Sequence, residues 1–442
     1  MTTATASPKS TAALATFVAE AVPSDAAITA ARRALATAIP LAASAARDAP
    51  AATLFAVLGP LSDARSVVVA GTDHRLPPTL AAMVIATATN APDFDDTDPQ
   101  TMVHPAPAVV PAAWALAVAH DRSLQVLLRA IAIGTEVAVR AGRAFGPGHD
   151  ARGWHPSATA GSLGAAAAAA AVVQDLEVDE IAQVLGLAAT QAAGLGIALG
   201  TMVKPLHFGR AAAAAVEAVG LVRAGLSAPP DGITGRRGLI EVMVPDADVD
   251  ILFDGLGQRW CCTEVEPKPY PCGVVAHPVV TGARQLHRTD GPGIDEVRLE
   301  VHPDVLRFMG NARPSTPLEA KLSVASCVAV ALQRGDLPIA AFQAEALVDP
   351  AVTAIRDVIA VEAHERTRQD ATLRVRRADT WERVTVTAAD AVVLDDDAVA
   401  SKGIAVATPV LGAMRAEALL AACFGHGDRP VTELVELTLP TS

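Results

Sequence analysis

The sequence has few aromatic residues and none of the motifs that mark common nucleotide-binding or hydrolytic sites. Only 3% of its 442 residues are aromatic, although 51% are hydrophobic, so alanine, valine and leucine supply most of the apolar side chains. This composition predicts helices that pack closely through small side chains. The chain contains no Gly-x-Ser-x-Gly, no P-loop and no Gly-x-Gly-x-x-Gly opening a helix, which argues against the chemistry that depends on those motifs.

Basic charge, paired cysteines and long apolar runs are also scarce. A net charge of -13 argues against nucleic acid as the main partner, because a phosphate backbone needs a basic surface. Five cysteines without a Cys-x-x-Cys pair favour a reduced compartment. Residues 1–21 lack the apolar run and cleavage site of a secretory signal, so we expect a cytoplasmic protein. Residues 158–173 are too few and too weakly apolar to predict a membrane span.

The order of expected elements predicts a mainly α fold with two domains. Apolar periodicity and capping residues predict helices at residues 12–21, 25–45, 79–89, 107–120, 124–144, 159–173, 179–193 and 206–224. Alternating strand patterns then appear at residues 295–302, 371–376 and 381–387, and helices are still expected at residues 317–335 and 351–359. We therefore expect a large all-helical domain at residues 1–260 and a smaller α+β domain at residues 261–399. A helix at residues 409–424 suggests that residues 400–442 return to the first domain, so that the smaller domain is inserted before the C-terminal helix.

The segment Gly-Thr-Met-Val-Lys-Pro-Leu-His-Phe-Gly-Arg, residues 200–210, is the first candidate site. Pro205 predicts that Lys204 is extended or in a turn and that a helix follows, which Gly225 can cap. Lys204, His207 and Arg210 would then surround a helix entrance with free backbone N–H groups, which suits a carboxylate or a phosphate. The alternative is that Lys204 is a solvated loop lysine.

Two further clusters combine acidic residues, histidines and a tryptophan. Asp93-Phe-Asp-Asp-Thr97 is followed by His104, and the alternative to a site is helix capping beside a solvated acidic loop. His155 follows Trp154 and precedes an alanine-rich helix. An isolated histidine in this position is usually a surface or packing residue, but a tryptophan beside a histidine often forms the wall of a pocket.

The fourth cluster runs from Lys268 to His277 and contains Tyr270, the only tyrosine of the chain. Two prolines stiffen the backbone that carries Lys268 and Tyr270, and a proline-stiffened domain linker is the alternative interpretation. Together the four clusters supply lysines, histidines, a tyrosine and a carboxylate. These groups are the equipment needed to remove a proton from a carbon next to a carboxylate.

A metal site is the rival interpretation of the same histidines and carboxylates. Its candidate ligands are His104, His155, His207, His277, Asp93, Asp95 and Asp96. No His-x-x-x-His or His-Glu-x-x-His pair places two ligands on one helix face, and the lysines of these clusters would repel a divalent cation. We therefore expect no metal.

The four clusters, in this order and at these separations, resemble the MmgE/PrpD family, which includes 2-methylcitrate dehydratase, cis-aconitate decarboxylase and iminodisuccinate epimerase. A later match is Thr-Pro-Leu-Glu-Ala-Lys-x-Ser, residues 316–323. The resemblance covers most of the chain. It implies a helical domain, a smaller domain that closes over it, a homodimer, and a site without metal or cofactor in the cleft between the domains.

The resemblance also implies roles for individual residues. Asp93 and Thr97 would hold the substrate, and His104 and His155 would flank the reacting carbons. Lys204 and Lys268 would bind carboxylates or an enolate.

One histidine or lysine would serve as base, and burial beside other cations would lower the pKa of a lysine enough for that role. We place Tyr270 with the catalytic candidates and His207 and His277 with the substrate-binding ones.

Three departures from the family pattern concern the substrate. Asn90 stands where the family often has a histidine, Val203 replaces a common threonine, and Gly273 stands where the decarboxylase has a histidine. The leading expectation is a lyase acting on a small di- or tricarboxylate. An epimerase or isomerase is the runner-up, and a catalytically silent protein that binds a metabolite is the alternative from another class.

Overall fold

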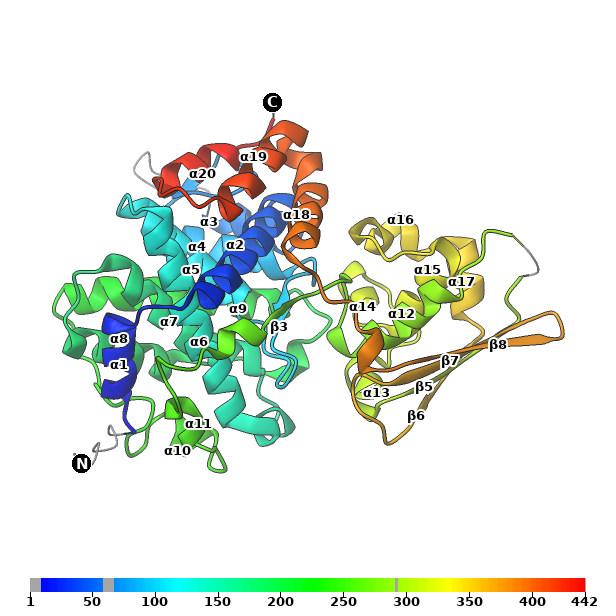
Figure 1. Ribbon diagram of the computed structural model, residues 1–442, viewed down its shortest axis with the longest axis horizontal. Coiled ribbons are helices and arrows are strands. Elements are labelled where there is room, and N and C mark those ends of the chain that lie inside the picture. Colours follow the sequence, from blue (N-terminus) through cyan, green and yellow to red (C-terminus); the bar gives the residue numbers. More distant parts are fainter. Residues whose placement is uncertain (1–8, 59–66, 291–292, 442) are drawn as a thin grey trace.

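The computed structural model describes residues 9–58, 67–290 and 293–441. Part of the N-terminal segment on which the expectation of no secretory signal rests lies outside these residues. Within the described chain, the buried apolar residues form two separate cores, one in a large lobe and one in a small lobe (Figure 1). The predicted mainly α fold class is confirmed.

The large lobe is built almost entirely from helices. They are α1 (Thr11–Glu20), α2 (Asp25–Ala45), α3 (Ala51–Leu58), α4 (Pro78–Asn90), α5 (Ala106–Ala119), α6 (Leu124–Ala151), α7 (Pro156–Val173), α8 (Val178–Gln191), α9 (Val203–Arg223), α10 (Leu239–Met243) and α11 (Asp250–Phe253), with the 3-10 turns η2 (Gly196–Ala198) and η3 (Cys261–Glu264). Two antiparallel pairs of very short strands complete it: β1 (Val67–Val68) with β2 (Arg75–Leu76), and β3 (Asp96–Thr97) with β4 (Glu266–Pro267).

Small side chains let the helices of the large lobe approach closely, as the composition predicts. A Cβ atom on Gly134 of α6 would lie 2.6 Å from the carbonyl oxygen of Gly164 on α7, so only glycine fits this crossing. Among the described residues, α7 alone is long and apolar enough to meet the length and composition test for a membrane span, but 94% of it is buried inside the protein. It is the central packing helix of the lobe.

The small lobe packs helices against one face of a four-stranded sheet. Its elements are η4 (Val274–Ala276), α12 (His277–Gln285), β5 (Glu296–Val301), α13 (Pro303–Met309), α14 (Pro317–Lys321), α15 (Val324–Arg334), η5 (Ile339–Phe342), α16 (Ala344–Leu347), α17 (Pro350–Arg356), β6 (Ile359–Ala363), β7 (Ala371–Arg377), β8 (Thr380–Val386) and η6 (Ala388–Asp390). The strand order is β6-β5-β7-β8, with β5 parallel to β6 and the other pairs antiparallel. Alternate residues of β5, including Val297 and Leu299, are buried, which is the predicted pattern.

The chain returns to the large lobe through α18 (Asp396–Leu411), α19 (Ala413–Phe424) and α20 (Val431–Leu437). Val399, Leu411 and Leu419 belong to the same core as α2. Figure 1 shows α1 and α20 on the large lobe and the small lobe joined to it by two segments that pass between the lobes. We propose that the domain division follows these two cores.

Three expected elements differ from the structure. Residues 317–335 form two helices rather than one, because Ser323 is extended and caps α15 through its side chain. The helix expected at residues 351–359 ends at Arg356, and Ile359 instead begins β6. The helix expected at residues 409–424 is divided in two: Pro409 lies inside α18, which begins at Asp396, and α19 begins at Ala413 after Gly412, whose φ is 77°.

Candidate active site

Two segments far apart in the chain pair with each other where the lobes meet. The loop after α4 carries Asp93 to Thr97, and the segment that leads into the small lobe carries Lys268. β3 pairs antiparallel with β4, and the Lys268 backbone N–H donates to the Asp95 carbonyl at 2.8 Å. This short ladder fixes the Asp93–Thr97 cluster beside the cluster that begins at Lys268.

Asp93 is the centre of a buried charge cluster. Its Oδ1 lies 2.6 Å from Lys204 Nζ and 3.0 Å from Lys268 Nζ. Lys268 Nζ also lies 3.2 Å from Asp95 Oδ1. All four side chains are buried, and the second carboxylate oxygen of Asp93 has no hydrogen-bond partner within the described chain. One acceptor atom is therefore left unused in the middle of the cluster.

The charges of the cluster stabilise one another. Burial alone would raise the pKa of the Asp93 carboxyl, but the neighbouring Lys204 and Lys268 ammonium groups hold that pKa well below its usual range. Burial alone would lower the pKa of Lys268, but Asp93 and Asp95 raise it above its usual value. The expectation of a lowered lysine pKa is therefore wrong for Lys268, because it has two carboxylate partners. Its role is that of a permanent cation.

His104 presents a neutral ring to the same cluster. Its Nδ1 lies 2.7 Å from the Asp96 carbonyl oxygen. A carbonyl can only accept, so this nitrogen carries the proton and Nε2 is left as an acceptor. Burial, together with the nearby Lys268 charge, lowers the pKa of His104 to about 4. The ring is therefore neutral near pH 7.

His155 and His207 form a second, directly bonded pair. Their Nδ1 atoms are 3.1 Å apart, so one ring donates to the other. Burial and the Lys204 charge lower the pKa of His155 well below its usual value, and burial lowers the pKa of His207. His155 immediately precedes α7, and the Trp154 ring stacks on His149. The tryptophan is thus anchored as a wall beside His155, which agrees with its predicted position.

Most of the predicted residues line two small adjoining cavities, although His207 lines neither of them. The first, which we call the histidine cavity, measures about 100 Å³ and is lined by Asp93, His104, Trp154, His155 and Lys204. The small lobe closes it with an apolar wall made by Val274, Val275, Phe308, Met309 and Leu322. A space this small fits a metabolite better than a drug-sized ligand, which typically occupies roughly 300 Å³ or more.

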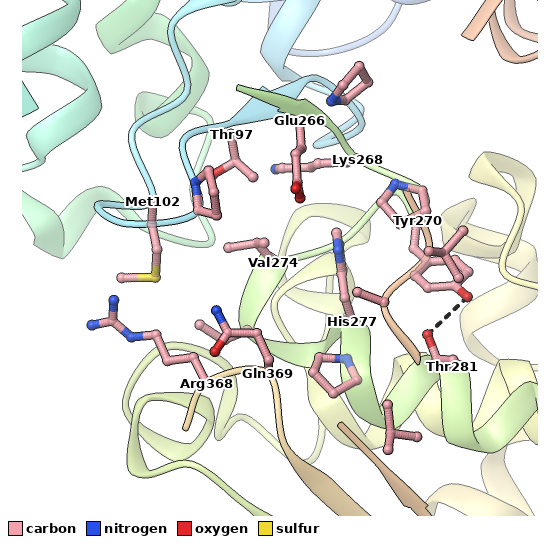
Figure 2. A pocket seen from close by; sticks show the side chains of 18 of the residues that line it. Thr97, Met102, Glu266, Lys268, Tyr270, Val274, His277, Thr281, Arg368 and Gln369 are labelled. Atoms are coloured by element: carbon pink, nitrogen blue, oxygen red, sulfur yellow. Dashed lines mark hydrogen bonds between the residues drawn. The ribbon is translucent and has the colours of Figure 1, made fainter. Parts of the chain in front are cut away.

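The second cavity, which we call the linker cavity, measures about 120 Å³ and contains Thr97, Glu266, Lys268, Tyr270 and His277 (Figure 2). Figure 2 shows Thr97, Glu266 and Lys268 on one side of it, and Arg368 and Gln369 of the small lobe on the other. Met102, Val274 and Val275 line both cavities and separate them. The structure therefore divides the predicted site between two compartments.

Tyr270 and His277 are placed differently within the linker cavity. The Tyr270 hydroxyl lies 3.2 Å from Thr281 Oγ1 and accepts a hydrogen bond from Arg284 at 3.0 Å. Figure 2 shows it directed towards α12 and away from Lys268. His277 Nε2 is buried and has no hydrogen-bond partner in the part of the chain that the structure describes. Of the two, His277 offers a ring nitrogen to a ligand, and a catalytic role for Tyr270 stays a prediction.

Comparison with known proteins decides the relationship. The MmgE/PrpD N-terminal domain matches residues 12–252, and the MmgE/PrpD C-terminal domain matches residues 270–412. The chain belongs to the MmgE/PrpD family. The residues that line the two cavities come from the N-terminal domain, from the C-terminal domain and from the segment between the two matched ranges, which contains Lys268.

Several members of this family with assigned activities are similar to the chain. Human cis-aconitate decarboxylase is 38% identical over 171 residues, which cover 37% of this chain and 35% of the relative. The mouse cis-aconitate decarboxylase is 29% identical over 325 residues, covering 68% and 64%. That of Aspergillus terreus is 28% identical over 291 residues, covering 60% and 59%. The matched regions thus span less than two thirds of each relative.

The local conformation at Lys204 corrects the sequence-based expectation. Helix α9 begins at Val203, so Lys204 lies in its first turn rather than in an extended segment. Proline is tolerated there because the first N–H groups of a helix have no intrahelical partner. Thr201 satisfies the N–H groups of both Val203 and Lys204, so the expected free N–H groups at this entrance are not available. Arg210 is exposed to solvent.

Sequence reasoning missed Lys402, which is partly exposed, and it named Asp95 and Asp96 only as rival metal ligands and Lys321 only within the family match at residues 316–323. Asp95 pairs with Lys268, and burial raises the pKa of Asp96 to about 7. Lys321 donates to the Ala91 carbonyl at 2.9 Å, and Lys402 donates to the Phe94 carbonyl at 2.6 Å. A usable signal existed for the lysines, because the chain contains only five and four of them meet here.

The side chains of the site do not form a ready metal centre. No group of three or more histidine, cysteine, aspartate or glutamate side chains lies close enough together to hold an ion, within residues 9–58, 67–290 and 293–441. The carboxylates that were the rival ligands, Asp93 and Asp95, are instead occupied by lysine ammonium groups. The residues present are suited to an anionic ligand.

Proposed function

We propose that this protein is a lyase of the dehydratase or decarboxylase type that removes an α-proton from a small di- or tricarboxylate. The observation that carries the proposal is the buried pair of ammonium groups on Asp93, beside a neutral His104 whose Nε2 is an acceptor. Membership of the MmgE/PrpD family and the similarity to proteins named cis-aconitate decarboxylase support a lyase.

The lysines supply the binding energy for carboxylates. Lys204 Nζ makes one hydrogen bond within the described chain, to Asp93. An ammonium group has three donors, so two remain for a substrate carboxylate in the histidine cavity. Asp93 holds this cation in place, and its own unused oxygen can accept a hydrogen bond from a hydroxyl group of the substrate.

His104 is the group we assign as base. Its neutral ring can take a proton, and the negative charge of a bound polycarboxylate would raise its pKa from about 4 towards neutrality. The enolate that forms would lie beside Lys204, with Lys268 held at the same Asp93 oxygen, and fixed cations in a buried site stabilise such a charge strongly. The ammonium groups thereby perform the charge neutralisation for which other enzymes use a metal, and we propose a reaction without a metal or cofactor.

An epimerase is the second candidate, and a specific observation favours it. His104 and His155 are both neutral and both line the histidine cavity. Two such rings could remove a proton from one face of a carbon and return it to the other. The first step is the same in both candidates, and only the fate of the enolate differs.

Proton NMR in heavy water tests the proposal. The purified protein is incubated with citrate, 2-methylcitrate, cis-aconitate, isocitrate and aspartate-derived dicarboxylates, with His104→Gln as the matched control. New vinyl or methylene signals, absent with the control, are the expected result and identify the substrate. Loss of an α-proton signal without a new product would establish the epimerase instead. Binding of a panel member without turnover or deuterium incorporation would contradict both and indicate a binding protein.

A further inference from the structure

The loop that carries Asp93 is held in an uncommon backbone conformation. Asp93 has a φ of 56°, in the left-handed region that side chains other than glycine seldom adopt. Such conformations cost free energy and persist only where the surroundings enforce them. Lys204 and Lys268 hold the Asp93 side chain itself, and further contacts lie on the residues that flank it.

Lysines from two different parts of the chain hold the two ends of this loop. Lys321 on α14 of the small lobe donates to the carbonyl of Ala91, and Lys402 on α18 donates to the carbonyl of Phe94. The Lys402 ammonium also lies 3.9 Å from the centre of the Phe94 ring, within the range of a cation–π interaction. The loop is fastened on each side of Asp93.

Lys402 also holds the second catalytic segment. Its Nζ donates to the Lys268 carbonyl at 2.9 Å, so a single ammonium group bridges the Asp93 loop and the Lys268 segment. Lys402 does not line the histidine or the linker cavity. It faces a separate cavity of about 530 Å³ behind the loop, whose lining includes Phe94, Lys321 and Lys402. Any effect of Lys402 on the reaction must pass through the two segments that it joins.

We propose that Lys402 is a positioning residue that sets the distance between the Asp93 carboxylate and the Lys268 ammonium group. This role rests on the proposed function. α18 packs against the core of the large lobe through Val399 and Leu411, which gives Lys402 a rigid base. Burial lowers the pKa of Lys402 to about 7, although the nearby Asp95 charge opposes this shift. Lys402 can hold both carbonyls whether it is charged or neutral, because an ammonium group has three N–H donors and a neutral amine has two.

Arg32 provides a matched control. It also donates to two backbone carbonyls of a distant segment, at 2.9 Å to Cys423 and 2.6 Å to Gly425, and it also fastens the C-terminal region to the large lobe. It lies on α2 and lines neither the histidine nor the linker cavity. Arg32→Met therefore removes the same kind of contact without touching the Asp93 loop.

The test compares Lys402→Met, Lys402→Arg and Arg32→Met in the full chain, with thermal midpoints measured alongside kinetics. A displacement of about 1 Å at reacting groups can cost on the order of a hundredfold in rate. For Lys402→Met we expect kcat to fall by roughly ten- to a hundredfold, with KM nearly unchanged. Lys402→Arg, which keeps two donors, should recover most of kcat. Arg32→Met should lower the thermal midpoint and leave kcat as in the unsubstituted protein.

A second readout does not depend on activity. Labelling lysine with ¹³C at Cε gives signals from only five residues, and those of Lys204 and Lys268 report the charge around Asp93. We expect both signals to move in Lys402→Met and to stay in place in Arg32→Met. Unmoved signals, an unchanged kcat, or an equal loss of kcat in Arg32→Met would each overturn the positioning role. If the unsubstituted protein turned over no substrate, the proposed function would fail, and the lysine signals alone would still decide the role of Lys402.

Discussion

Two buried clusters of charged side chains in the large lobe are alike in composition but differ in how many of their hydrogen-bonding atoms have a partner. Arg140 and Glu136 on α6 are both fully buried. The Arg140 guanidinium donates to Glu136 Oε1 and to the carbonyls of Ile251, Asp254 and Arg259, while Glu136 Oε2 accepts from Cys262 N–H. Asp93, in contrast, keeps one oxygen without a partner, and its cluster opens into a cavity.

The difference separates a structural cluster from a functional one. A buried network in which every polar side-chain atom has a partner can only fasten segments together, as Arg140 does for the chain from α11 to Arg259. A buried network with unused groups has a free-energy cost that a ligand can remove. Completeness of hydrogen bonding therefore indicates function more clearly here than burial or charge does.

The largest expected effect comes from breaking the open cluster. Lys204→Ala should lower kcat/KM by roughly a thousandfold, because it removes a cation from the position where negative charge develops. Asp93 keeps Lys268 as a partner, so the thermal midpoint should change little. Steady-state kinetics on the substrate found by NMR measures the effect, with the exposed Arg210→Ala on the same helix as control. Full activity in Lys204→Ala would show that our assignment of this residue is wrong.

Breaking the closed cluster should act on stability instead. Arg140→Met leaves Glu136 buried without its charge partner, and such a loss typically costs about 3–5 kcal/mol. Urea denaturation should show a lower midpoint with a similar slope. Turnover per folded molecule should match that of the unsubstituted protein. A selective loss of kcat at full stability would show that the Arg140 cluster is not merely structural.

The smallest effect concerns pH and uses two histidines. Burial lowers the pKa of both His104 and His149 to about 4. In the unfolded chain these histidines take up a proton near pH 6.5, whereas in the folded protein they do so only near pH 4. The free energy of unfolding therefore falls as the pH drops from about 6.5 to about 4, by on the order of 1.4 kcal/mol for each unit by which a histidine pKa is lowered. Both His104→Gln and His149→Gln should make this loss shallower in denaturation measured across that range. Only His104→Gln should also lose activity, since His149 is bonded to Thr159 and lines neither cavity. Retained activity in His104→Gln would remove it as the base.

Much of the fold could be predicted from periodicity and capping. The helix expected at residues 25–45 matches α2 at both ends, because Ser24 accepts a hydrogen bond from Ala27 N–H and the apolar spacing is regular. β6 was not predicted, because the segment Ile359 to Ala363 is short and its alternate residues Ile359 and Val361 are only partly buried. It is a strand because it pairs with β5, which supplies hydrogen bonds from another part of the chain.

The site was predictable to the extent that its residues stand in clusters. Asp93, His104, His155 and Lys204 were expected together and line one cavity. Lys402 stands alone in an ordinary amphipathic helix, and its partners at Phe94 and Lys268 are backbone carbonyls, which every residue possesses. The rarity of lysine in the chain was therefore the one sequence signal that marked it.

The sequence by itself determined which segments are helical. It also determined which polar residues stand next to prolines on a stiff backbone. Both properties depend on residues that are neighbours in the chain. Tertiary structure alone decided that Asp93 holds two lysines through one oxygen, that His104 is neutral, and that Tyr270 is tied to α12. Each of these depends on distances between segments more than a turn of helix apart, and on the exclusion of water from the space between them. Electrostatic interactions become strong only when folding has created that environment.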